Sequence, residues 1–162
     1  MSNKEEAVKA NIQGLTFTLG EEIFAVDISS VKEVLEYKGV TKVPRMPDFM
    51  IGVINLRDHA VPVLDMRIKF GMECGEVTVD TCVVIVETEV DGEAMGIGIL
   101  VDSVNEVASF NAEDIESAPK IGTQLNTDFI QGIVKTGEIF IILLKIDSVL
   151  NKKDLEIIAE NQ

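Results

Sequence analysis

The chain has 162 residues, a mass of 17.7 kDa and a formal net charge of −14. This length suits one compact domain or two very small ones, and an apolar fraction of 46% is typical of a globular protein rather than a disordered one. No run reaches the roughly 18 apolar residues that span a bilayer, and the N-terminus lacks a basic segment followed by an apolar one, so we expect a cytoplasmic protein without membrane insertion.

Short runs of Val, Ile, Leu and Phe, broken by Gly, Asp and Asn, predict an all-β protein. The expected strands cover residues 15–19, 23–26, 34–43, 53–57, 61–64, 81–87, 94–101, 106–110, 132–136 and 139–144. Turns are expected at 20–22, 58–60, 89–93 and 136–138. Helical signal is sparse: Ser29 or Ser30 could cap a short turn through Glu33, and Asp147 could cap a C-terminal helix over 147–160. Residues 1–12 are expected to form a flexible tail.

Acidic charge is concentrated in the middle of the chain. Between Lys69 and Lys120 there is no lysine or arginine, and twelve acidic residues fall in that stretch. Such a surface repels nucleic acid phosphates and anionic lipid, and it can steer a basic protein partner. Acidic residues kept for solubility would give the same composition, so the charge alone does not identify a partner.

The segment 52–57 carries the most informative pattern. In a strand, successive side chains point to opposite faces, so Ile54 and Leu56 share one face while Asn55 and Arg57 share the other. The first face suits a core, and the second offers an amide and a forked guanidinium for reading a partner. An ordinary solvated strand face is the alternative interpretation.

An internal repeat organises the chain. Residues 48–54 match residues 128–134, and 63–64 match 143–144 at the same offset of eighty positions. Upstream, 30–34 match 103–107, and a Val-Asp pair ending in Asp27 or Asp102 comes shortly before each copy. The matches predict two related β units of roughly five strands, packed together, with approximate bounds of 14–77 and 78–146.

Motifs for catalysis or metal binding are weak. His59 is expected in an exposed turn, and no nucleophile elbow, phosphate-binding loop or kinase signature is present in the sequence. Cys74 and Cys82 are expected to be reduced thiols, with Cys82 in the core, and two cysteines without His or acidic ligands at the right spacing do not form a zinc site. We therefore expect no cofactor and no metal.

Several segments together carry a family resemblance. They are Val43–Arg57, Val61–Arg67 with Phe70, Phe17–Gly20, Phe24–Ile28 and Gly98–Val104. This pattern resembles the CheW family of chemotaxis coupling proteins and covers residues 14–150, which we interpret as a single CheW-like domain. The resemblance implies an all-β fold of two SH3-like five-stranded β-barrels packed together, with short helical turns and a C-terminal helix.

The same resemblance implies a role without catalysis. CheW-like adaptors tether the histidine kinase CheA, through its regulatory domain, to the cytoplasmic tip of methyl-accepting chemoreceptors. The expected function is therefore a scaffold that lets conformational change pass between receptor and kinase. The protein would be cytoplasmic and recruited to membrane-associated receptor arrays.

The partner-binding residues that the resemblance implies lie in three segments. They are Asn55, Leu56 and Arg57; Val31, Glu33 and Val34; and, as weaker candidates, Val101 and Val104. Glu33 is expected to pair with Arg57 and fix its guanidinium, and the groove between the barrels is expected to take the receptor. The family commonly has Gly after the Arg, whereas this chain has Asp58, which either tolerates the turn conformation or marks a shifted hairpin.

Two other classes of function stay open at this point. A small-barrel nucleic-acid binder would need a basic face with aromatic side chains, and one Tyr, no Trp and a net charge of −14 count against it. An enzyme using paired carboxylates would need two acidic groups that converge in a closed pocket.

Overall fold

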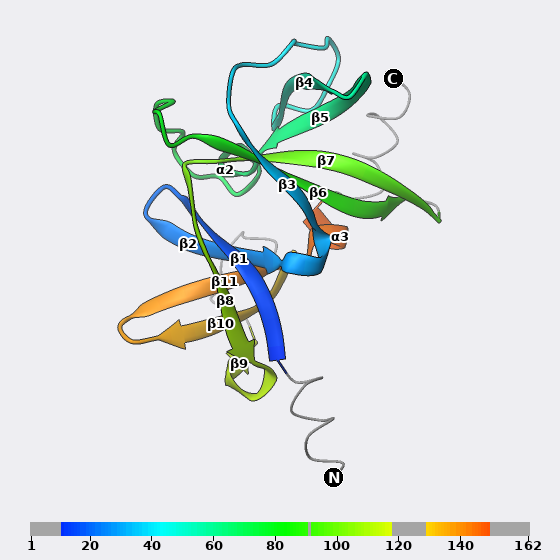
Figure 1. The fold of residues 1–162 in the computed structure, drawn as a ribbon. Helices are drawn as coiled ribbons and strands as arrows, with labels where there is room; N and C mark the ends of the chain where they lie inside the picture. The colour runs from blue at the N-terminus through cyan, green and yellow to red at the C-terminus, as the bar shows by residue number, and fades with distance from the viewer. Residues whose placement is uncertain (1–10, 91, 118–128, 150–162) are drawn as a thin grey trace.

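Two β-sheets, one above the other in Figure 1, make up the fold. The computed structural model describes residues 11–90, 92–117 and 129–149. One sheet has six strands in the order β8-β1-β2-β11-β10-β9, and the other has five in the order β3-β6-β7-β5-β4. The expected all-β fold is confirmed, with the difference that one sheet carries a short sixth strand.

Most strands form where apolar residues alternate or cluster between turn residues. Their bounds are β1 Asn11–Leu19, β2 Glu22–Asp27, β3 Val31–Glu36, β4 Met50–Leu56, β5 His59–Asp65, β6 Cys82–Val90, β7 Glu93–Val101, β8 Ser103–Asn111, β9 Ile115–Glu116, β10 Ile130–Thr136 and β11 Ile139–Leu144. The helical segments are the 3-10 turns η1 Ile28–Ser30 and η2 Ala112–Asp114 and the short helices α2 Met66–Lys69 and α3 Ile146–Val149.

Several expected boundaries are corrected. The strand expected at 34–43 begins at Val31 and ends at Glu36, after which only Thr41 returns to the sheet, through a bridge to Val53. Asp27, rather than a serine, caps η1 by accepting a hydrogen bond from the Ser29 N–H, and residue 33 belongs to a strand. Residues 11 and 12 start β1 rather than ending a tail. The rest of the expected tail, 1–10, and residues 150–160 of the expected C-terminal helix lie outside the described residues.

The two sheets do not follow the two sequence repeats, so the expected division into barrels of 14–77 and 78–146 is wrong. The hairpin β1–β2 lies in the sheet of β8 to β11, and the hairpin β6–β7 lies in the sheet of β3 to β5. The connections explain the exchange. Only the η1 turn separates β2 from β3, and only Asp102 separates β7 from β8, so in each repeat the chain runs on into the other sheet instead of turning back.

Strands that correspond in the two sequence repeats nevertheless hold corresponding positions in the two sheets, which supports the repeat. The strand order β3-β6-β7-β5-β4 corresponds to β8-β1-β2-β11-β10, and in each sheet one pair is parallel, β5 with β7 and β11 with β2. The Asp65 N–H donates to the Phe49 carbonyl at 2.7 Å, and eighty positions later the Lys145 N–H donates to the Phe129 carbonyl at 2.7 Å. Both β4 and β10 also carry a register shift, just before Gly52 and Gly132.

The largest core lies between the two sheets. On β6, Val84 and Val86 face this inter-sheet core, whereas Val83 and Ile85 face the interior of the five-stranded barrel. A chain of stacked rings runs through the inter-sheet core, with centroid separations of 6.1, 5.6 and 4.4 Å along Phe17, Phe24, Phe70 and Phe129. Because central strands are buried on both faces, they read as continuous apolar runs rather than alternating ones.

Candidate partner-binding surfaces

The turn between β4 and β5 places Arg57 at the tip of a hairpin. Leu56 pairs with His59, so Arg57 and Asp58 are the two central residues, one position earlier than the expected turn at 58–60. Their φ angles are 51° and 67°, the left-handed values of a type I′ turn. Asp58 therefore adopts the conformation that a glycine would take more readily, and the hairpin register is the ordinary two-residue one.

Arg57 forms the expected ion pair with Glu33. Its Nη1 lies 2.7 Å from Glu33 Oε1, and Nη2 lies 3.5 Å from Oε2. Glu33 is on β3 and Arg57 follows β4, which are the two edge strands of the five-stranded sheet. The pair thus spans the seam between β3 and β4, where no ladder of backbone hydrogen bonds closes the five-stranded sheet into a complete barrel. The Arg57 side chain is 75% exposed, so its guanidinium remains accessible to a partner.

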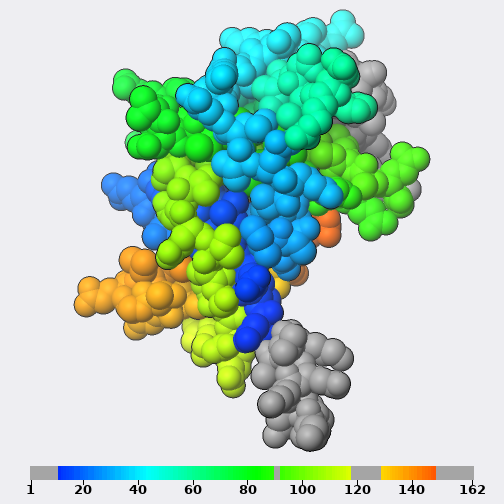
Figure 2. Space-filling view, viewed as in Figure 1, coloured from blue at the N-terminus to red at the C-terminus, as the bar shows by residue number. Residues whose placement is uncertain are grey.

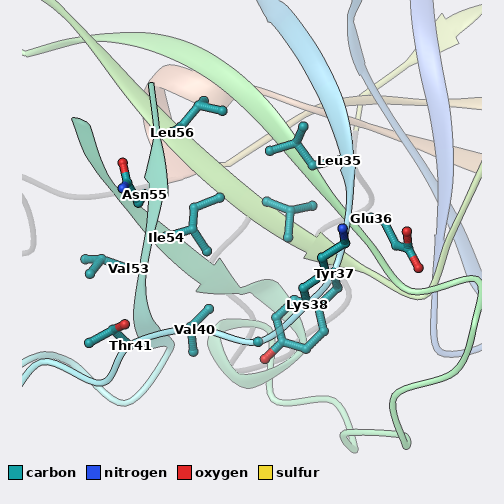
Figure 3. Close-up of a pocket in the computed structure, with 12 residues that line it drawn as sticks. Leu35, Glu36, Tyr37, Lys38, Val40, Thr41, Val53, Ile54, Asn55 and Leu56 are labelled. Carbon is teal, nitrogen blue, oxygen red and sulfur yellow. The ribbon is translucent and has the colours of Figure 1, made fainter. Parts of the chain in front are cut away.

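An open groove of about 630 Å³ lies along this seam. Leu35 of β3 and Ile54 of β4 point toward one another across it in Figure 3, while Asn55 points away from the groove. Leu56 is half-buried, and the bridge between Thr41 and Val53 closes the other end of the seam. We call this region, defined by Glu33, Asn55, Leu56, Arg57 and the groove beside them, the seam surface.

The valine candidates lie on a different surface. On β3, Val34 pairs with Val84, whose side chain belongs to the inter-sheet core, yet Val34 itself is 41% exposed. Val31 and Val104 are half-buried and pack against the edge of the same core. Figure 2 shows β3 (blue) and β8 (yellow-green) next to each other on this face. We call the exposed apolar region defined by Val31, Val34 and Val104 the inter-sheet surface.

Cys82 packs against the same core as Val31 and Val104. It pairs with Glu36 of β3, and its thiol donates a hydrogen bond to the Asp80 carbonyl at 3.2 Å. Burial raises the pKa of the Cys82 thiol, and the negative charges of Asp80 and Glu36 raise it further. The thiol is therefore protonated at neutral pH, which suits a packing residue rather than a nucleophile.

Val101 is the one candidate that the structure removes. Only 1% of it is exposed, and it belongs to the inter-sheet core, so a partner cannot contact its side chain in this conformation. The C-terminal part of β7, residues 97–101, is buried on both faces, so the groove that the resemblance implied does not reach Val101. The sequence also did not indicate Tyr37 and Val40, which line the seam groove from the segment wrongly expected to be a strand.

A buried ionic cluster was also missed. Arg67 is 5% exposed, and its guanidinium binds Asp65 through both oxygens and Asp102 through Nη1. The hydrogen bond to Asp65 raises the pKa of Arg67 above its ordinary value. Its sequence signal was an aspartate at the end of each of two apolar strands, Asp65 and Asp102, with an arginine two residues after the first.

The two sheets with exchanged hairpins, the open seam and the inter-sheet surface define a two-barrel β protein. In the described part of the chain no group of three or more His, Cys, Asp or Glu residues could hold a metal ion. None of the helices described here has the length and apolar character needed to cross a membrane.

Comparison with known proteins identifies the family. The model of the CheW-like domain matches residues 13–154. The chain is 35% identical to the chemotaxis protein CheW of Klebsiella aerogenes over 89% of this chain and 84% of that protein, and 28% identical to CheW of Bacillus subtilis over 96% and 97%. The crystal structure of the scaffolding protein TtCheW from Thermoanaerobacter tengcongensis is similar, with a TM-score of 0.77 and 34% identity over 88% of this chain and 94% of that one.

The chain belongs to the CheW family. It is a non-catalytic chemotaxis adaptor that couples chemoreceptors to the kinase CheA. Membership of this family of scaffolds decides against the paired-carboxylate enzyme, and the comparisons do not support the nucleic-acid binder.

Proposed function

We propose that the two surfaces serve the two partners separately. In this proposal the seam surface binds the regulatory domain of CheA, and the inter-sheet surface binds the cytoplasmic tip of a methyl-accepting chemoreceptor. The observation that carries it concerns two neighbours on β3: the Glu33 side chain reaches the seam and pairs with Arg57, whereas Val34 lies on the inter-sheet side, opposite Val84. One strand thus contributes to both surfaces.

The seam surface suits a small β-domain. Edge strands present backbone N–H and C=O groups that another strand edge can pair with, and β3 and β4 are both edges. Arg57 and Asn55 add an exposed guanidinium and an exposed amide beside the half-buried Leu56. Such an arrangement, an apolar centre with polar groups around it, is typical of specific protein interfaces.

The inter-sheet surface suits a helical hairpin. Helices bind to apolar surfaces by placing an apolar stripe on apolar side chains, with specificity from charges at the edge of the contact. Val31, Val34 and Val104 supply the apolar side chains, and the exposed Glu36 and Glu106 lie on the same two strands. Binding at this surface would recruit the protein, in the cytoplasm, to receptor arrays at the membrane.

Two charge-introducing variants test the assignment. Arg57→Asp should weaken binding of the CheA regulatory domain by about tenfold or more, and Val34→Asp should do the same for a soluble chemoreceptor signalling fragment. Lys135→Asp, an exposed residue of β10, is the matched control and should leave both affinities nearly unchanged. Isothermal titration calorimetry of each variant with each partner measures the two binding affinities. If either variant weakens both partners equally, or neither, the division of surfaces is wrong.

A further inference from the structure

The cluster around Arg67 links the two sheets through side chains. Arg67 Nε and Nη2 donate to Asp65 Oδ1 and Oδ2 at 3.0 and 2.9 Å, which fixes the guanidinium on the side of the five-stranded sheet. Nη1 donates to Asp102 Oδ1 at 2.9 Å. Asp65 also accepts a hydrogen bond from the Arg67 N–H and so caps α2. The guanidinium is therefore held in one orientation between two carboxylates.

Asp102 carries the link to the six-stranded sheet. It is the single residue between β7 and β8, so it lies where the chain passes from one sheet to the other. Its Oδ2 accepts a hydrogen bond from the Gly20 N–H at 2.6 Å, and its own N–H donates to the Thr18 carbonyl at 2.9 Å. A continuous path of hydrogen bonds thus runs from α2 through Arg67 and Asp102 to the β1–β2 turn.

The chain also passes between the sheets at the equivalent place between β2 and β3, and the residues at this opposite passage have different chemistry. In the sequence repeat, Asp147 corresponds to Arg67 and Asp27 corresponds to Asp102. Two acidic residues therefore stand where the cluster has an arginine and an aspartate. Asp147 accepts a hydrogen bond from Thr88 at 2.7 Å, and Asp27 accepts from Ser29. An open hollow of about 340 Å³ lies between them. Only one of the two passages is held by a buried arginine.

We propose that Arg67, acting through Asp102, is a positioning residue for receptor binding that sets the spacing of β3 and β8 across the inter-sheet surface. The residues of this surface come from different sheets, Val31 and Val34 from β3 and Val104 from β8. Val104 follows Asp102 by two residues, so the anchor on Arg67 sets where β8 begins. The seam surface belongs to a single sheet and does not depend on this anchor. The inference rests on the proposed function for its choice of partner.

Buried ion pairs are weak sources of net stability, and their best-supported role is to specify one arrangement over others. The cluster fits that role because its bonds join segments of two sheets rather than neighbours on one strand. Removing Arg67 outright would leave the buried Asp65 carboxylate without its cation, beside the partly exposed Asp102, and would risk unfolding. Asp102→Asn is milder, because the amide oxygen can still accept from Gly20 while the charge that attracts Nη1 is lost.

Affinity measurements test the positioning role. We expect Asp102→Asn to weaken binding of a soluble chemoreceptor signalling fragment by about tenfold and to change binding of the CheA regulatory domain by less than about twofold. Arg67→Lys keeps the buried charge without the fork and should show the same selective loss in smaller measure. Thr88→Val, which removes the hydrogen bond at the opposite passage, is the matched control and should leave both affinities nearly unchanged. Equal losses for both partners, or no loss for the receptor fragment, would overturn the proposal.

A second measurement needs no partner. Nitroxide labels at Glu36→Cys on β3 and Ser109→Cys on β8, in a chain with Cys74→Ser and Cys82→Ser, report the distance between these two strands by pulsed electron spin resonance. We expect Asp102→Asn to broaden or shift this distance distribution, and an unchanged distribution would refute the positioning role. If the unaltered chain binds neither partner in titrations, the proposed function fails, and the distance measurement still decides the role of Arg67.

Discussion

Arg57 and Glu33 form an ion pair, with 2.7 Å between Nη1 and Oε1, across the seam of the five-stranded sheet. An exposed pair of this kind contributes at most about 1 kcal/mol to the free energy of unfolding, so its value to the protein lies elsewhere. We interpret it as a device that holds the Arg57 guanidinium in a fixed orientation at the tip of a hairpin.

A charge exchange separates this interpretation from a purely structural one. We expect Arg57→Glu to weaken binding of the CheA regulatory domain by about tenfold or more while the free energy of unfolding changes by less than about 1 kcal/mol. Adding Glu33→Arg restores an ion pair but places the cation on β3, so binding should stay weak. Titration calorimetry measures the binding affinity, and urea unfolding measures the free energy of unfolding. Recovered affinity in the double variant would mean that the pair only holds the seam together.

The bulges of β4 and β10 predict glycine-specific stability. A Cβ on Gly52 would lie 2.5 Å from the Thr41 carbonyl oxygen, and one on Gly132 would overlap the Ile115 side chain and lie 2.9 Å from the Glu116 carbonyl oxygen. We expect Gly52→Ala and Gly132→Ala each to lower the free energy of unfolding by about 1–3 kcal/mol in urea titrations. Gly96→Ala is the control, because nothing lies within 4 Å of its added Cβ. Comparable losses at all three positions would contradict the close approach.

Asp58 offers a test of the turn. Its φ of 67° lies in the left-handed region, which costs a residue with a Cβ about 1–2 kcal/mol and costs glycine little. Asp58→Gly should therefore raise the free energy of unfolding by up to about 1 kcal/mol, and Asp58→Ala should lower it, because alanine lacks the side-chain oxygen that helps Asp tolerate this conformation. Thermal unfolding measures both. A loss of stability in Asp58→Gly would mean that the Asp58 side chain makes a contact that outweighs its backbone strain.

Val101 and Val34 should respond in opposite ways to truncation. Val101 is 1% exposed, so Val101→Ala should lower the free energy of unfolding by about 1–3 kcal/mol. Val34 is 41% exposed, and Val34→Ala should change the free energy of unfolding by less than about 0.5 kcal/mol while weakening receptor binding. Urea unfolding and titration with a receptor fragment measure the two effects. A larger stability loss at Val34 than at Val101 would contradict the assignment of Val34 to the surface and Val101 to the core.

Local alternation predicted most strands because it depends on neighbouring residues, whereas the ion pair, between residues 24 positions apart, was expected from the family resemblance. Ile54 and Leu56 do pack into the barrel interior, and Arg57 does reach Glu33. The segment after Glu36 misled the prediction because Tyr37 and Val40 continue the apolar pattern. Gly39 lies between them with a φ of 99°, where the chain cannot continue as a strand.

The exchange of hairpins could not be predicted from the repeat. Two similar repeats bury similar side chains whether each hairpin stays in its own unit or moves to the other, so apolar patterning does not distinguish the arrangements. The distinguishing signal was the single residue Asp102 between two long strands, too short a connection for a turn back into the same sheet. The hydrogen bond between Asp102 and Arg67 depends on this exchange of hairpins, so it could not be predicted from the repeat either.

Reconstituted kinase activity tests the central claim most directly. Receptor-containing membranes and CheA are assayed for autophosphorylation with no adaptor, with this chain, and with a chain carrying both Arg57→Asp and Val34→Asp. An adaptor that couples the two partners through separate surfaces predicts strong activation only with the unaltered chain. Activation by the doubly substituted chain as strong as by the unaltered one, or no activation by either, would contradict the account.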